Sequence, residues 1–141
     1  MHGKSLFLST IGVVLLVGCA FAQRADTTQP TPLHAHDAAL AAPHHHKLLL
    51  ENAAVRVFET RIASGERTPV HSHPWPAALY VLSWSDFVRY DPAGKVLLDS
   101  RTMASKPQPG AALWSTPVGP HSIHNVGTSE LLVIAVEVKR Q

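Results

Sequence analysis

The chain has 141 residues, the length of one ordinary domain, and 45% of them are hydrophobic while only 16% are charged. This composition excludes a disordered or collagen-like protein. The net charge is +2 and the Lys and Arg residues form no basic run, so we expect no nucleic-acid partner. Histidine is the unusual residue, with ten copies against a single cysteine. That count makes metal binding the first chemistry to consider.

Residues 1–22 have the three-part layout of a secretory signal peptide. Lys4 precedes an apolar run from Leu6 to Val17, and small residues follow that run. The run is about a dozen residues long, whereas a helix that crosses a bilayer needs about 20. The segment therefore predicts export rather than a permanent transmembrane helix.

Two processing sites compete within the signal. Residues 20–22 (AFA) fit ordinary cleavage before Gln23, whereas residues 16–19 (LVGC) resemble the bacterial lipobox, which would leave a lipidated Cys19. We therefore expect a bacterial protein that is exported, either periplasmic or anchored to the membrane as a lipoprotein. Because Cys19 is the single cysteine, we expect no disulfide in the folded part.

Residues 23–44 are predicted to form a flexible linker, because they are rich in Ala, Pro and Thr and lack a sustained period of 2 or 3.6. Residues 37–42 (DAALAA) suit one helical turn, but a single turn without packing is unstable in water. Five histidines lie in or beside this linker and are expected to be too mobile for a preorganised site, so that they bind metal only loosely. They are His34, His36, His44, His45 and His46.

Residues 45–141 are predicted to form one all-β domain. Short runs rich in apolar, β-branched or aromatic residues alternate with Gly- and Pro-containing turns at a spacing near ten residues, which favours a β-sandwich or barrel. The last run is apolar on both faces and should be a central strand. The expected strands are 47–51, 55–62, 77–84, 87–90, 96–98, 111–114 and 131–138, and the expected turns are 64–66, 91–94, 106–110 and 117–120.

The strongest chemical signal is the pair His71 and His73. Residues two apart in a strand project from the same face, so both imidazoles can converge on one ion. His121 follows the Pro- and Gly-rich segment 117–120 and supplies a third candidate ligand, with Asn125 four residues beyond it. His124 is three residues from His121, and strand alternation places it on the opposite face.

These residues, in this order and spacing, resemble the two sequence motifs of the cupin family, and the likeness covers about residues 45–141. The closest likeness is to small single-domain bacterial cupins. The resemblance implies a jelly-roll barrel of six to eight strands that binds one metal ion inside through His71, His73 and His121. The residues that carry it are Gly65, His71, His73, Gly110, Pro117, Gly119, Pro120, His121 and Asn125.

One departure from the cupin pattern concerns the metal. The glutamate expected three or four residues after the second histidine is replaced by Ala77 and Ala78, so a two-His, one-carboxylate iron site is not expected. Three imidazoles suit Zn²⁺, and the identity of the divalent ion stays open among Zn, Fe, Ni, Cu and Mn. The alternative is a barrel that has lost its metal and uses His71 and His73 as hydrogen-bonding residues.

The aromatic residues near the motifs are candidate pocket residues. Trp75, within a Pro-Trp-Pro segment, is expected to form a rim, and Trp114, Tyr80 and Asn125 are expected to line the pocket. Tyr80 is also the candidate proton donor, while ordinary core packing is the competing interpretation of each aromatic residue.

The predicted function is that of an exported metal-binding cupin-domain protein that binds a small molecule at the three-His site. If it is an enzyme, the metal would support a dioxygenase, isomerase or hydrolase reaction. The alternative is a non-catalytic ligand-binding or sensing module without metal. Membrane contact is expected only through the signal or a lipid anchor, and a homodimer is the assembly that we consider.

Overall fold

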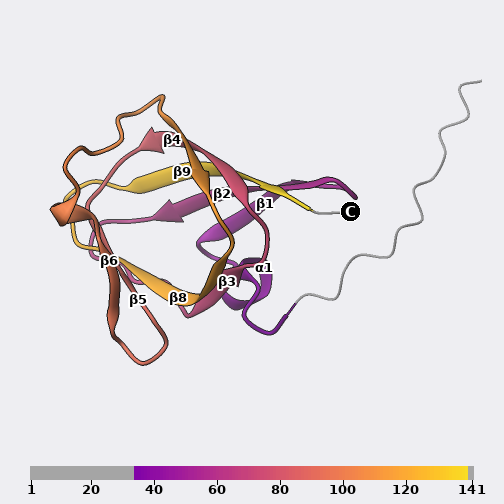
Figure 1. Ribbon diagram of the computed structural model, residues 1–141, viewed down its shortest axis with the longest axis horizontal. Helices are drawn as coiled ribbons and strands as arrows, with labels where there is room; N and C mark the ends of the chain where they lie inside the picture. The colour runs from indigo at the N-terminus through magenta and orange to yellow at the C-terminus, as the bar shows by residue number, and fades with distance from the viewer. Residues whose placement is uncertain (1–33, 140–141) are drawn as a thin grey trace, which may run out of the picture.

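The chain forms a barrel of two antiparallel sheets, seen in the computed structural model, which describes residues 34–139 (Figure 1). One sheet has five strands in the order β1-β2-β9-β4-β7, and the other has four in the order β3-β8-β5-β6. No helix in this part of the chain is long and apolar enough to cross a membrane. The elements are α1 (Ala38–Ala41), β1 (His46–Glu51), β2 (Val55–Ile62), β3 (His71–His73), β4 (Ala77–Ser83), β5 (Phe87–Tyr90), β6 (Val96–Asp99), the 3₁₀ helix η1 (Ser100–Thr102), β7 (Ala112–Ser115), β8 (Val118–Asn125) and β9 (Leu131–Val138).

The strand pattern of the sequence matches the structure closely. The apolar run 131–138 is the strand β9, which lies between β2 and β4 in the middle of the larger sheet, as expected for a strand without a polar face. The nine strands of the described residues exceed the six to eight that the cupin resemblance implied. The excess reflects short strands such as β3, which has three residues.

The predicted turn 117–120 is wrong in part, because β8 begins at Val118 and runs through Pro120. His71 pairs with His121 while His73 pairs with Val118, so β8 carries one more residue than β3 between these pairs. Such a bulge leaves a backbone N–H without a ladder partner and therefore tolerates proline within a strand. The irregular pairing thus explains why turn-forming residues occur inside β8.

The predicted linker boundary at residue 44 is also wrong, because residues 34–44 belong to the structured part. Asp37 caps α1 by accepting a hydrogen bond from the Ala39 N–H, and Ala38 and Ala42 are buried. The turn contacts β1 and β3, beside which it lies in Figure 1. Packing therefore stabilises a turn that would be unstable alone. Residues 23–33, the signal segment 1–22 and Cys19 lie outside the described residues.

The interior of the barrel has an apolar part and a polar part. Ile62, Phe87 and Leu131 form the apolar cluster, at the end of β2 and the beginning of β9. At the opposite ends of these two strands, Arg56 and Glu137 are completely buried. The histidines His46, His71 and His121 are buried as well. The polar part of the interior is where a chemical site can form.

Candidate metal site

Three histidine side chains meet in the polar part of the barrel. His71 and His73 come from β3, and His46 is the first residue of β1. One ring nitrogen from each residue lies within 4.8 Å of the others. The ring centroids are 4.5 Å apart for His46 and His71, and 5.2 Å apart for the other two pairs. Two imidazoles bound to one ion at about 2.1 Å have centroids roughly 5 Å apart, so the spacing fits a shared metal ion.

His121, the third predicted ligand, lies next to this cluster. Its ring centroid is 4.3 Å from that of His71 and 5.8 Å from that of His73, and its side chain is buried. The structure therefore brings His71, His73 and His121 together. The most compact set of nitrogens nevertheless contains His46 in place of His121, so the expectation that His46 is too mobile to take part is wrong.

The Nδ1 atom of every histidine in this group already has a hydrogen-bond partner. That of His46 contacts the carbonyl oxygen of Ala42 at 3.2 Å, and that of His71 contacts the carbonyl oxygen of Pro69 at 2.9 Å. A carbonyl can only accept, so Nδ1 carries the proton and Nε2 presents a lone pair. The remaining two contacts are His73 Nδ1 to Glu137 Oε1 at 2.7 Å and His121 Nδ1 to the Gly119 carbonyl oxygen at 2.8 Å.

This arrangement is the one that metal-binding histidines require. Partners on Nδ1 fix the tautomer and the orientation of each ring, and leave Nε2 free for the ion. The Nε2 atom of His71 is buried and has no hydrogen-bond partner among the described residues. A buried nitrogen without a partner is costly in a protein interior, and coordination to a metal ion would satisfy it.

Three of these histidines, His46, His71 and His121, are held in the neutral form that binds metal. Burial, together with the neighbouring His71 and His73, lowers the pKa of His46 to about 2. Burial likewise lowers the pKa of His71 to about 4 and that of His121 to about 3. Protons therefore compete weakly for these imidazoles near neutral pH.

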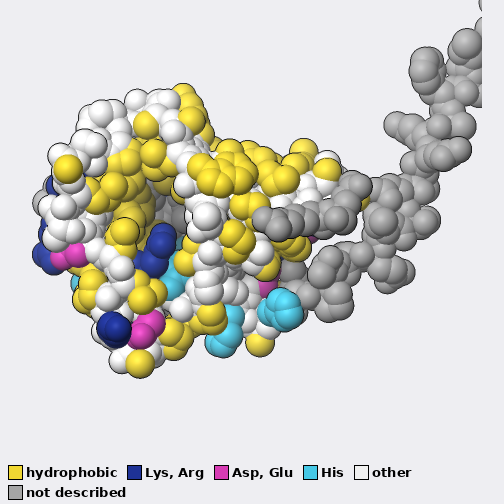
Figure 2. Space-filling view, in the orientation of Figure 1, with side chains coloured by type: hydrophobic (Ala, Val, Ile, Leu, Met, Phe, Trp, Pro, Cys, Tyr) yellow, Lys and Arg dark blue, Asp and Glu magenta, His cyan; other side chains and the backbone are white. Residues whose placement is uncertain are grey.

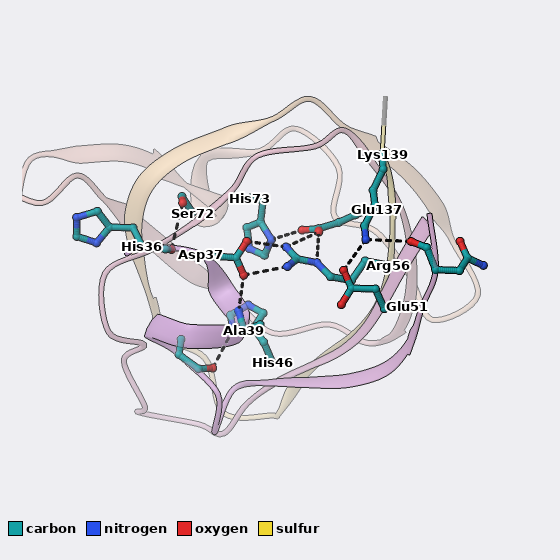
Figure 3. A network of polar contacts seen from close by, with 12 residues as sticks. His36, Asp37, Ala39, His46, Glu51, Arg56, Ser72, His73, Glu137 and Lys139 are labelled. Carbon is teal, nitrogen blue, oxygen red and sulfur yellow. Dashed lines mark hydrogen bonds and ion pairs between the residues drawn. The ribbon is translucent and has the colours of Figure 1, made fainter. Parts of the chain in front are cut away.

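A buried cluster of charged residues contacts the Nδ1 atom of His73. Figure 3 shows the contacts running from Asp37 through Arg56 and Glu137 to His73. Both carboxylate oxygens of Asp37 accept hydrogen bonds of 2.9 Å from Arg56, whose Nη2 also lies 2.7 Å from Glu137 Oε2. Two carboxylates and one guanidinium give this cluster a net charge of −1, which favours a cation nearby.

Glu137 and Arg56 were not among the predicted site residues, yet the sequence carries a signal for both. In β9, Glu137 lies an even number of residues from the buried Leu131 and Ala135. In β2, Arg56 lies an even number of residues from the buried Phe58 and Ile62. Alternation alone therefore places each charge inside the barrel. The resemblance to a family motif pointed instead to positions 77 and 78 for the carboxylate.

Trp75 covers the charge cluster instead of the histidines. Its ring lies 4.7 Å from the guanidinium carbon of Arg56, and the ring of Phe58 lies 4.6 Å from the same atom. The guanidinium therefore makes cation–π contacts with two aromatic rings. Trp75 was expected to form a rim of the pocket, and its cation–π contacts are with Arg56 and Lys139.

Two predicted pocket residues, Tyr80 and Trp114, lie on the outside of the barrel. Tyr80 and Trp114 are 48% and 63% exposed, and Ala78 pairs with Trp114 on the same outer face of the larger sheet. Tyr80 therefore does not point into the barrel, and its predicted role as an internal proton donor is wrong. The next residue of β4, Val81, is fully buried and points into the barrel, so Tyr80 points to the outside.

Asn125 is buried, but its side chain is used up by the fold. Its Nδ2 donates to the carbonyl oxygens of Ile62 and Ser129, each at 2.9 Å. Its Oδ1 accepts from Ser85 Oγ at 2.7 Å and from the Gly127 N–H at 3.1 Å. All four hydrogen-bonding positions of the amide are occupied, so Asn125 has a structural role instead of lining the pocket.

The other histidines stay apart from the cluster. His124 pairs with Val88 in the ladder between β5 and β8, at the opposite parity to His121, as predicted. His34, His36 and His44 are exposed. A groove of about 330 Å³ runs past His34, His36 and His73 to residues 117–120 of β8. His73 is thus the member of the cluster that borders this outer groove.

Comparison with solved structures supports the fold. A cupin domain from Bordetella pertussis Tohama I is 19% identical, with a TM-score of 0.55, and the match covers 67% of this chain and 92% of that chain. The chain has the cupin fold. An RmlC-like cupin with a double-stranded β-helix fold, from Methanocaldococcus jannaschii, is 13% identical with a TM-score of 0.47, covering 66% of this chain and 77% of that one. No family model and no curated protein matches the chain.

The predicted all-β jelly roll and its cupin resemblance are therefore confirmed. Within this cupin barrel, the three histidines of the compact cluster could hold one metal ion. This compact set shares His71 and His73 with the sequence motif and contains His46 in place of His121.

Proposed function

We propose that this cupin-fold protein binds one divalent metal ion through the Nε2 atoms of His46, His71 and His73, with His121 as the adjacent fourth imidazole. The observation that carries the proposal is the set of Nδ1 hydrogen bonds, which leaves four Nε2 lone pairs in one buried cluster. An all-imidazole site suits Zn²⁺ and also accepts Fe²⁺, Ni²⁺ or Cu²⁺.

The proposed site replaces the missing cupin glutamate by an indirect carboxylate. In this proposal Glu137 is not a metal ligand. It accepts a hydrogen bond from the Nδ1–H of His73. A carboxylate in that position raises the basicity of the imidazole and offsets part of the positive charge of the ion. This argues for a site tuned to a cation rather than for histidines kept only as hydrogen-bonding residues.

We further propose that the barrel admits a small molecule next to the ion. A bound divalent ion would polarise a substrate oxygen or lower the pKa of a water molecule. Such chemistry serves a dioxygenase, isomerase or hydrolase, and the choice among them is left to substrate screening. The competing function is a ligand-binding or sensing module without metal, in which the neutral histidines donate and accept hydrogen bonds.

Elemental analysis tests the metal directly. The protein is purified without an affinity tag and without added metal, beside a His71→Ala, His73→Ala double variant and a His44→Ala control. His44 is exposed, so its loss removes a histidine without touching the cluster. Near-stoichiometric metal in the wild type and the control, and none in the double variant, supports the site. Equal trace metal in all three would leave the metal-free module as the function.

Export remains a prediction with its own experiment. Mass spectrometry of the mature N-terminus distinguishes a diacylglyceryl group on Cys19 from a chain that begins at Gln23. A lipidated Cys19 would mean a membrane-anchored lipoprotein, and a Gln23 start would mean a periplasmic protein released by ordinary cleavage. The homodimer is likewise a prediction, which light scattering on the purified protein measures.

A further inference from the structure

A second basic side chain, that of Arg89, points into the barrel close to the histidines. Arg89 pairs with Ile123 in the ladder between β5 and β8, and His121 lies two residues before Ile123 on the same face. Phe87, two residues before Arg89 on the same face of β5, belongs to the apolar core cluster. Arg89 therefore lies between the apolar part of the interior and the histidine cluster.

The positive charge of Arg89 affects the pKa values of two histidines. It contributes to the lowered pKa values of both His71 and His121. In the space-filling view the molecule is hollowed between the two sheets, and a basic side chain and a histidine lie side by side in that hollow (Figure 2). The hollow thus gives solvent and small molecules access to both kinds of side chain.

Arg89 has no partner for its charge within the part of the chain that the structure describes. Among residues 34–139 it forms no ion pair and no hydrogen bond, and its buried Nε is unsatisfied. Burial lowers the pKa of its guanidinium, and no carboxylate offsets this effect. Arg56, the other arginine of the interior, has instead two carboxylates. A guanidinium with a buried, unsatisfied Nε and no anion beside it is costly for the fold, which indicates a function that needs it.

The sheet that faces β5 across the barrel indicates what kind of anion would fit. On its inner face, Val81 and Ala135 are buried and apolar, and Val133, which pairs with Val81, packs against the apolar core cluster. One guanidinium matches a single negative charge, and its planar fork binds both oxygens of a carboxylate. The apolar walls suit a hydrocarbon body attached to that carboxylate.

We propose that Arg89 is the anchor for the carboxylate of a small organic acid with an apolar body, bound in the hollow of the barrel beside the histidine cluster. As a statement about substrate class it rests on the proposed function. The anchor itself depends only on Arg89 and its surroundings. It is a binding residue and not a metal ligand, because a guanidinium opposes a nearby cation.

Binding of simple acids tests the anchor. Isothermal titration with hexanoate and benzoate, and with hexanamide and benzamide as neutral isosteres, is carried out on metal-free protein, so that direct coordination to an ion cannot contribute. We expect the acids to bind and the amides to bind at least about tenfold more weakly. Arg89→Gln should weaken the acids by about tenfold or more, because charged hydrogen bonds are lost. Arg89→Lys should retain part of the affinity.

Arg61→Gln is the matched control, because it removes the same charge from an arginine that is exposed and paired with Glu130. It should leave acid binding unchanged. Circular dichroism and the melting temperature of Arg89→Gln establish that the variant is folded. Absence of saturable acid binding to the wild type, or equal acid affinity in the wild type and Arg89→Gln, would overturn the anchor.

The anchor and the metal can fail separately. Acid binding that is lost in Arg89→Gln, in a protein that takes up no metal, upholds the anchor and refutes the proposed metal function. Stoichiometric metal, together with acid binding that is unchanged in Arg89→Gln, upholds the metal function and refutes the anchor. Arg89→Gln should also hold metal at least as tightly as the wild type, because it removes a neighbouring positive charge.

Discussion

The Nδ1 atom of His73 lies 2.7 Å from Oε1 of Glu137, whose other oxygen is held by Arg56. This contact joins the candidate metal cluster to the buried ion pairs behind it. It fixes the tautomer of His73 and directs Nε2 toward His46 and His71. The carboxylate that the family motif would supply as a ligand is thus replaced by one that acts through an imidazole.

Replacing Glu137 should therefore weaken metal binding. Glu137→Gln keeps the size of the side chain and an oxygen that accepts from His73, but it removes the negative charge. We expect a loss of about 10- to 100-fold in metal affinity, as for other partners of metal-binding histidines, measured by competition with a chelator. Glu130→Gln, at a partly exposed ion pair with Arg61, is the control and should bind like the wild type.

His46 separates the structural site from the one that the motif implies. His46→Ala should lower metal affinity by more than tenfold, because it removes a ligand of the compact cluster. His44→Ala, two residues away and exposed, should have no effect in the same titration. An unchanged affinity in His46→Ala would mean that His71, His73 and His121 hold the ion without it.

Asp37 should matter for stability although it precedes every strand. Asp37→Asn leaves the buried Arg56 with one carboxylate instead of two and weakens the cap of α1. We expect a loss of about 3 kcal/mol in the free energy of unfolding, measured by urea denaturation. The matched control is Asp99→Asn, whose partner Arg101 is well exposed, and its effect should be under about 1 kcal/mol. Equal effects of the two variants would contradict a buried role for Asp37.

The metal-free protein should lose stability as the pH falls below about 6.5. His46, His71 and His121 have lowered pKa values in the folded state, so the unfolded chain binds more protons in this range. Each contributes roughly 1.4 kcal/mol of destabilisation per pH unit between pH 6.5 and 5, above the range in which carboxylates titrate. Urea titrations in a chelating buffer measure the slope, and His46→Gln should make it shallower. A flat profile over this interval would show that the histidines are not buried in the neutral form.

Strand positions were predictable because burial imposes a period of two on short apolar runs. The runs 55–62, 87–90 and 131–138 match β2, β5 and β9 residue for residue. Turn chemistry misled the prediction only where Pro120 occupies a bulge. Local residue patterns therefore determine most of the β framework, while pairing irregularities depend on partner strands distant in sequence.

The site was predictable only in part. The spacing of His71, His73 and His121 indicated where the histidines gather, but His46 follows a segment whose composition resembles a linker. That segment is held in place by the buried ion pair of Asp37 with Arg56, which no local pattern encodes. Tyr80 and Trp114 were assigned to the pocket by proximity in sequence to the motifs, whereas strand parity places them outside. Long-range pairing, rather than residue type, decides these positions.

The ion pairs of Arg56 also set the order in which the site can assemble. Asp37 comes from the turn before the first strand and Glu137 from the last strand, and both must dock before the charge cluster is complete. A chain emerging from the ribosome or a translocation channel could form β2 and β3 early. His73 would then lack its Nδ1 partner until β9, which carries Glu137, is in place. The proposed metal site would therefore be completed only when the last strand docks.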